Sequence, residues 1–160
     1  MFDIKPREWV FSNKDLLECV NKIRAKAKVN QEYDIPLLAG YSDDGKTLYV
    51  DKDMPDGYVS RYTGKQIPVL NFLLFHEGVE KALIDQWGLS YLPSHAVAQY
   101  VEHGAVKAAD LPDKEYNGFM AKYIKISREK KEYHVPPDLD LTPYKGETEM
   151  LAKMKGLKNG

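Results

Sequence analysis

Two titratable residues lie one helical turn apart within the most apolar stretch of the chain. Residues 66–87, QIPVLNFLLFHEGVEKALIDQW, predict a helix whose apolar stripe carries His76 and Glu80 beside Phe72 and Leu73. Burying an unpaired carboxylate costs several kcal/mol, so these two groups need a partner. A divalent cation suits them, because an imidazole nitrogen and a carboxylate oxygen one turn apart converge at ligand distances of about 2.0–2.2 Å. The alternative is a hydrogen-bonded polar pair inside the core.

The next predicted helix supplies further candidate ligands. Residues 94–109, SHAVAQYVEHGAVKAA, place His95 and Glu102 on one face with small residues between them. His76, Glu80 and His95 then offer two nitrogen ligands and one oxygen ligand and leave a fourth position for water, as in catalytic zinc sites. Glu102 is either a fourth ligand or an acceptor that orients a ligand histidine. The alternatives are a capping or packing role for His95 and an exposed position for Glu102.

Glu77 is a candidate general base. It follows His76 but is rotated by about 100° around the helix, so it cannot bind the same ion from the same direction. It can instead take a proton from water that attacks a carbonyl group and pass this proton to the leaving amine. The alternative is an exposed residue paired with Lys81 at i, i+4. Candidate donors to the transition state are Tyr91, Tyr100 and His134.

The stretch His76-Glu77-Gly78-Val79-Glu80 resembles the His-Glu-x-x-His helix of zincin metallopeptidases, with glutamate in place of the second histidine and His95 as a displaced ligand. The resemblance covers about residues 45–105 and points to short zincin-like proteins of bacteria and phages. It implies a zincin-like fold and an edge strand before the helix that binds extended substrate by backbone pairing. Tyr49 and Val50 are the substrate-binding residues implied in this way.

The elements around these residues predict an α+β fold. Apolar spacing over 14–28 predicts an amphipathic helix, and β-branched and aromatic residues around the turn Asp43-Asp44-Gly45 predict a hairpin of strands 37–42 and 47–52. Pro68 should lie in the first turn of the 66–87 helix and Gly88 should end it, while Ser94 is a candidate cap for the helix after it. The remaining predicted elements are a helix over 114–133, an extended proline-rich tail over about 134–147 and a short helix over 147–157.

Length and composition limit the classes of protein. The chain has 160 residues, 43% hydrophobic and 29% charged, and predicts a single zincin-like domain over 1–160. One cysteine, Cys19, excludes an internal disulfide and cysteine-based zinc sites. The sequence contains neither a membrane span nor a signal-peptide pattern, so we expect a soluble cytoplasmic protein without a membrane partner.

The net charge of −1 and the mixed charges around Lys122–Lys131 favour a solvated helix face over a nucleic-acid patch. His103 and His134 are predicted bystanders.

The residues predict a metal-dependent hydrolase of the metallopeptidase type. Zn²⁺ is the expected metal, and a peptide or protein is the expected substrate. Fe²⁺, Mn²⁺ and Ni²⁺ also suit two histidines and one or two carboxylates. The alternative is a non-catalytic structural or partner-binding protein, for example one encoded by a phage, in which the polar cluster is a metal staple or a hydrogen-bond network without turnover. A helical di-metal carboxylate site is not favoured, because the chain lacks repeated Glu-x-x-His pairs. The sequence leaves the oligomeric state open.

Overall fold

The computed structural model describes residues 18, 21–22 and 25–157 and divides them between two compact units. Unit 1 includes Asp56–Tyr116, and unit 2 includes Ala27–Pro55 and the chain from Asn117 onward. The prediction of a single domain stays a prediction, because compact units of one chain need not fold independently. A helix was predicted over 14–28. Residues 18, 21–22 and 25–26 are helical and residues 27–28 are not, while the other positions of this range, including Cys19, lie outside the described residues.

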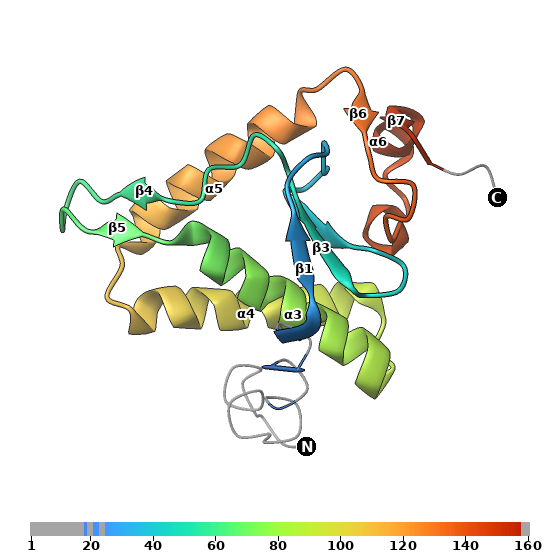
Figure 1. Ribbon diagram of the computed structural model, residues 1–160. Coiled ribbons are helices and arrows are strands. Elements are labelled where there is room, and N and C mark those ends of the chain that lie inside the picture. The colour runs from blue at the N-terminus through green and yellow to red at the C-terminus, as the bar shows by residue number, and fades with distance from the viewer. Residues whose placement is uncertain (1–17, 19–20, 23–24, 158–160) are drawn as a thin grey trace. The chain divides into compact units, whose positions relative to one another are not determined.

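Unit 1 is built around two packed helices. A short antiparallel hairpin of β4 (Tyr58–Val59) and β5 (Gln66–Ile67) leads into α3 (Val69–Trp87), which is followed by α4 (Tyr91–Ala108) and by the first turn of α5 (Asp113–Arg128). Figure 1 shows α3 and α4 side by side, with α3 in green to yellow-green and α4 in yellow. Their contact is lined by residues that are fully buried, namely Val79, Ala82, Leu83, Ala98 and Val101. Alanine on both helices lets the two backbones approach closely.

The ends of α3 and α4 follow from local chemistry. Pro68 is the N-cap of α3 rather than a residue of its first turn, because Gln66 and Ile67 pair with β4. Gly88, with φ of 65°, ends α3 in the left-handed conformation as predicted. The prediction of Ser94 as the cap of the next helix is wrong, since α4 already begins after Ser90. The Ser94 hydroxyl instead donates to the Ser90 carbonyl at 2.8 Å.

Unit 2 contains a three-stranded sheet in the order β1-β3-β2. The predicted hairpin is confirmed as β2 (Ala39–Tyr41) and β3 (Thr47–Val50), which pair antiparallel with Gly40 opposite Tyr49. The strand β1 (Lys28–Asn30) pairs parallel with the other side of β3 and was not predicted. The predicted edge position of Tyr49 and Val50 is therefore wrong. Both sides of β3 are paired, so its backbone is not free to bind an extended peptide.

The C-terminal segment completes unit 2. The remainder of α5 is followed by β6 (Tyr133–His134), the 3₁₀ helix η1 (Thr142–Tyr144), α6 (Thr148–Ala152) and β7 (Met154–Lys155), which pairs parallel with β6. Residues 134–147, predicted as an extended tail, include η1 and contribute to the core. That core consists of Ile35, Tyr49, Tyr133, Val135, Leu139, Tyr144, Met150 and Met154.

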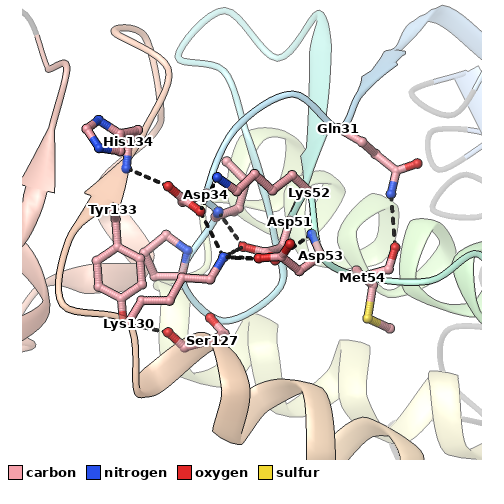
Figure 2. Close-up of polar contacts among 12 residues, drawn as sticks. Gln31, Asp34, Asp51, Lys52, Asp53, Met54, Ser127, Lys130, Tyr133 and His134 are labelled. Carbon is pink, nitrogen blue, oxygen red and sulfur yellow. Dashed lines mark hydrogen bonds and ion pairs between the residues drawn. The ribbon is translucent and has the colours of Figure 1, made fainter.

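A buried ion network also belongs to unit 2. Figure 2 shows the Lys130 ammonium among three carboxylates, with Nζ 2.8 Å from Asp34 Oδ1, 3.0 Å from Asp51 Oδ2 and 2.8 Å from Asp53 Oδ2. The side chains of Asp34 and Asp51 are 5% and 3% exposed and that of Lys130 is 15% exposed. The sequence predicted a solvated helix face around Lys122–Lys131. Lys130 departs from this prediction, because its ammonium group is largely buried among carboxylates.

The fold class is mixed α and β, which agrees with the predicted α+β class. Within the described residues, no helix combines the length and the apolar character needed to cross a membrane.

Candidate metal centre

Three side chains of unit 1 bring one ligand atom each to a common point. The distances are 2.8 Å from Glu80 Oε2 to His95 Nδ1, 3.4 Å from Glu80 Oε2 to His76 Nε2, and 3.3 Å between the two histidine nitrogens. Ligands of a tetrahedral metal at about 2.1 Å lie about 3.4 Å from one another. The three atoms could therefore hold a metal ion after small side-chain movements, and no other group in the described part of the chain meets this condition.

The helices position these ligands as the apolar pattern predicts. His76 and Glu80 follow each other by one turn on α3 and are each 6% exposed, while His95 reaches them from α4. The His95 side chain is 40% exposed, in contrast to the 8% of His76 and Glu80. The His95 edge of the site is therefore in contact with solvent.

The metal-free site is held together by charge. Burial alone would lower the pKa of His76, but hydrogen bonds to Glu102 and Glu80 outweigh burial and raise this pKa to about 10. Burial opposes ionisation of Glu80 as well, yet hydrogen bonds from His76 and His95 hold the Glu80 pKa below its usual value. An imidazolium between two carboxylates thus replaces the positive charge that a cation would supply.

Glu77 is buried beside this cluster. Glu77 is only 9% exposed, and Lys81 pairs with Asp85 at 2.8 Å, so the alternative of an exposed Glu77 paired with Lys81 does not hold. Burial, and then the nearby charge of Glu80, raise the pKa of Glu77 to about 8. A buried carboxyl group with a strongly raised pKa beside other charged groups is a candidate functional residue.

Glu102 lies on the opposite side of the His76 ring from the ligand atoms. Its Oε1 is 2.8 Å from His76 Nδ1, and its Oε2 accepts a hydrogen bond of 2.6 Å from the Tyr116 hydroxyl. Of the two predicted roles of Glu102, the geometry favours the acceptor that orients His76 over the fourth ligand. Burial and the charge of Glu102 raise the pKa of Tyr116 above its usual value, so its hydroxyl stays a donor.

The other candidates lie in different places. The Tyr91 hydroxyl is 3.4 Å from His95 Nδ1, so Tyr91 flanks the open side of the site. His103 is exposed, and Tyr100 is 42% exposed. His134 belongs to unit 2, where its backbone N–H donates to Asp34.

Tyr49 and Val50 also belong to unit 2 and lie in the middle of its sheet, where the Tyr49 hydroxyl donates to Asp138 at 2.7 Å. Tyr116 was missed by the sequence analysis, and with 11 tyrosines in the chain no local signal distinguishes it. No protein-family model matches this chain, and no match to it was found among curated proteins or solved structures.

Proposed function

We propose that this protein is a metal-dependent hydrolase that cleaves a peptide or amide bond, with His76, Glu80 and His95 as the metal ligands. One observation carries the proposal: three ligand atoms at metal-ligand spacing lie beside a buried carboxyl group, Glu77, whose pKa is raised to about 8 by burial and by the charge of Glu80. Titratable groups with strongly shifted pKa values beside charged partners cluster at functional sites.

The donor set fits Zn²⁺ best among the common divalent ions. Two imidazole nitrogens and one carboxylate oxygen with a fourth position open to solvent are the ligands of many catalytic zinc sites. When bound, such a metal acidifies water and polarises a carbonyl group. The proposal extends to a zincin-like kinship, for which the His-Glu-x-x-Glu pattern is the support.

Glu77 carries the proton transfers in this proposal. Its carboxylate oxygen accepts a proton from the water whose oxygen attacks the carbonyl carbon. As the bond between that carbon and nitrogen breaks, Glu77 returns the proton to the leaving nitrogen, so that a carboxylic acid and an amine are formed. His76 and His95 keep their positions in the ligand cluster throughout the reaction. The buried residues of α3 and α4 keep bulk water away from Glu77.

A metal staple without turnover is the second candidate. The hydrogen bonds among His76, Glu80, Glu102 and Tyr116 support it, because these groups satisfy one another and would also rigidify the α3–α4 contact. In that case the metal stabilises unit 1, but Glu77 contributes nothing to its function.

The first experiment measures metal content. Protein purified without a histidine tag is incubated with Zn²⁺, Mn²⁺, Ni²⁺ or Fe²⁺, desalted and analysed by mass spectrometry of the metal. We expect close to one equivalent of Zn²⁺ in the wild type and a large loss in Glu80→Ala. Less than about a tenth of an equivalent of every metal would refute both candidates.

The second experiment separates the enzyme from the staple. A library of quenched fluorescent peptides is incubated with the zinc-loaded wild type, with Glu77→Gln and with the control Glu129→Gln, an exposed residue of the segment after α5. The enzyme requires that Glu77→Gln keeps its zinc and loses at least about a hundredfold in turnover, the usual contribution of a general base. Equal turnover in Glu77→Gln and wild type would remove Glu77 from the reaction, and zinc binding without any cleavage would favour the staple.

A further inference from the structure

A hydrogen-bonded chain runs from the candidate metal site to the start of another helix. His76 Nδ1 lies 2.8 Å from Glu102 Oε1, and Glu102 Oε2 lies 2.6 Å from the Tyr116 hydroxyl. The three residues come from α3, α4 and the first turn of α5, and each is 6% exposed or less. Both oxygens of Glu102 are therefore occupied, one by each neighbour.

This series of hydrogen bonds determines which nitrogen of His76 is available to a metal. A carboxylate accepts hydrogen bonds only, so Glu102 requires a proton on His76 Nδ1. In a neutral imidazole the lone pair is then on Nε2, and Nε2 is the nitrogen that faces Glu80 and His95. The orientation of Glu102 thus decides whether His76 presents the correct atom.

The Tyr116 side chain is held on two sides. Its ring packs edge-on against Phe72 at 5.8 Å between centroids, and Phe72 precedes His76 by one turn on α3. Its hydroxyl contacts Glu102 on α4. Tyr116 is 1% exposed, so water cannot readily replace its hydroxyl as the donor to Glu102.

We infer that Tyr116 is a positioning residue of the metal site: it holds Glu102 so that His76 binds metal through Nε2. The inference rests on the metal binding of the proposed function but not on catalysis. Loss of the hydroxyl would free Glu102 Oε2 to seek another donor and would loosen the tautomer and the orientation of His76. Residues that orient a metal-binding histidine typically contribute 10–100-fold to metal affinity, and we expect about tenfold for Tyr116 because it acts through Glu102.

The test compares two conservative variants. Tyr116→Phe keeps the ring on Phe72 and removes the hydroxyl. Tyr133→Phe is the matched control, because Tyr133 is equally buried at 1% and its hydroxyl donates at 2.7 Å to the Ser127 carbonyl in unit 2. Zinc affinity is measured by competition with a chromophoric chelator, and Co²⁺ replaces zinc for visible absorption spectra of the ligand field.

We expect zinc to bind about tenfold more weakly to Tyr116→Phe, with an altered cobalt spectrum, and within about twofold of wild type to Tyr133→Phe. A Tyr116→Phe affinity within twofold of that of the control would overturn the inference while leaving the proposed function intact. A wild type that binds no zinc would refute the proposed function itself, and the inference with it.

A measurement on the wild type covers the case in which Tyr116→Phe fails to fold. Long-range proton–nitrogen correlation spectra of the zinc-loaded, ¹⁵N-labelled protein identify the tautomer of each histidine. The inference requires a proton on Nδ1 of His76 and metal on Nε2. Metal on Nδ1 would overturn it, because Glu102 and Tyr116 would then not orient the ligand atom.

Discussion

Replacing Lys130 with methionine should strongly destabilise unit 2, because this change removes the ammonium group from a buried ion network. Methionine keeps the length of the apolar stem but leaves Asp34 and Asp51 without their ammonium partner. Both carboxylates are almost completely buried, with side-chain exposures of 5% and 3%. Removal of one partner from a buried ion pair costs about 3–5 kcal/mol, because the other charge stays in a poorly solvating environment.

The expected cost lies at the lower end, at about 3 kcal/mol, because both carboxylates retain other donors. Asp34 Oδ2 still accepts from the His134 N–H at 2.9 Å, and Asp51 Oδ2 still accepts from the Ile35 N–H at 2.9 Å. Lys52, whose Nζ is 3.3 Å from Asp34 Oδ1, supplies some remaining positive charge.

The assay is urea unfolding at pH 7, with hydrogen exchange of the β3 amides as a local measure of unit 2. Lys125→Met is the matched control, because Lys125 is 75% exposed and lies 3.8 Å from Glu129, an exposed pair that should contribute less than about 1 kcal/mol. Adding Asp51→Asn to Lys130→Met should recover part of the loss by removing one buried charge. A Lys130→Met effect no larger than that of the control would refute the reasoning.

The same variant should show a distinct dependence on pH. Burial favours the neutral form of Asp34, but hydrogen bonds from Lys130 and the His134 backbone outweigh burial and hold the Asp34 pKa below 3.8. A carboxyl group with a lowered pKa stabilises the folded state above its unfolded pKa and loses this contribution as the pH falls through the folded value. Without Lys130 the buried carboxyl can escape its penalty by protonation. The difference between variant and wild type should therefore shrink as the pH falls from 7 towards 4.

The remaining predictions concern protons at the metal site and two glycines. Zinc binding at pH 7 should release at least one proton, because His76 has a pKa of about 10 in the metal-free protein and must lose a proton to bind the metal. Calorimetry in buffers of different ionisation enthalpy counts the released protons, and a count of zero would contradict the prediction. The metal-free protein should lose stability in urea unfolding as the pH rises from 6.5 to about 10. A histidine with a raised pKa stabilises the fold fully below its pKa in the unfolded state, and this contribution is lost as the pH rises through its pKa in the folded state. A free energy of unfolding that does not change over this range would argue against a protonated His76. Gly118→Ala should stabilise α5 by about 0.5–1 kcal/mol, because an added Cβ meets nothing within 4 Å. Gly57→Ala should destabilise the protein, because its Cβ would overlap the Ile67 carbonyl oxygen. Thermal melts in which both substitutions shift the melting temperature in the same direction would contradict the comparison.

Local patterns were sufficient to predict the long helices and the hairpin. The apolar stripe of α3 and the turn between β2 and β3 are encoded within a few residues, which is why both were recognised. The strands β1 and β6 were not, since each has two or three residues and is defined by its partner rather than by its own periodicity. The wrong edge position of β3 has the same origin, because it depends on the pairing with β1.

The candidate metal site shows the same division. The grouping of His76, Glu80 and His95 could be predicted, because titratable groups on an apolar helical stripe need a partner and the stripe is recognisable in the sequence. Tyr116 could not, since its role depends on where α5 begins relative to α4. Lys130 could not either, because nothing in a lysine-rich run indicates which lysine meets carboxylates that lie 79 and 96 residues earlier.

The division of the chain into two units has a consequence for the order of folding. Asp56–Tyr116 interrupts unit 2, so every contact between the two parts of unit 2 closes a loop that contains this segment. Contacts in the candidate metal site span 4–26 residues, from His76–Glu80 to His76–Glu102, whereas the Tyr144–Pro36 contact of unit 2 spans 108. Short separations cost less loop-closure entropy and form faster.

The two ends of the Asp56–Tyr116 segment are also joined, by a hydrogen bond of 3.3 Å from the Arg61 N–H to Glu115 Oε2. Once unit 1 has folded, the long loop that unit 2 must close is reduced to a short one. We therefore expect the α3–α4 pair to acquire amide protection before β1 and β3 in pulse-labelled refolding. Zinc added during refolding should then accelerate the appearance of unit 2.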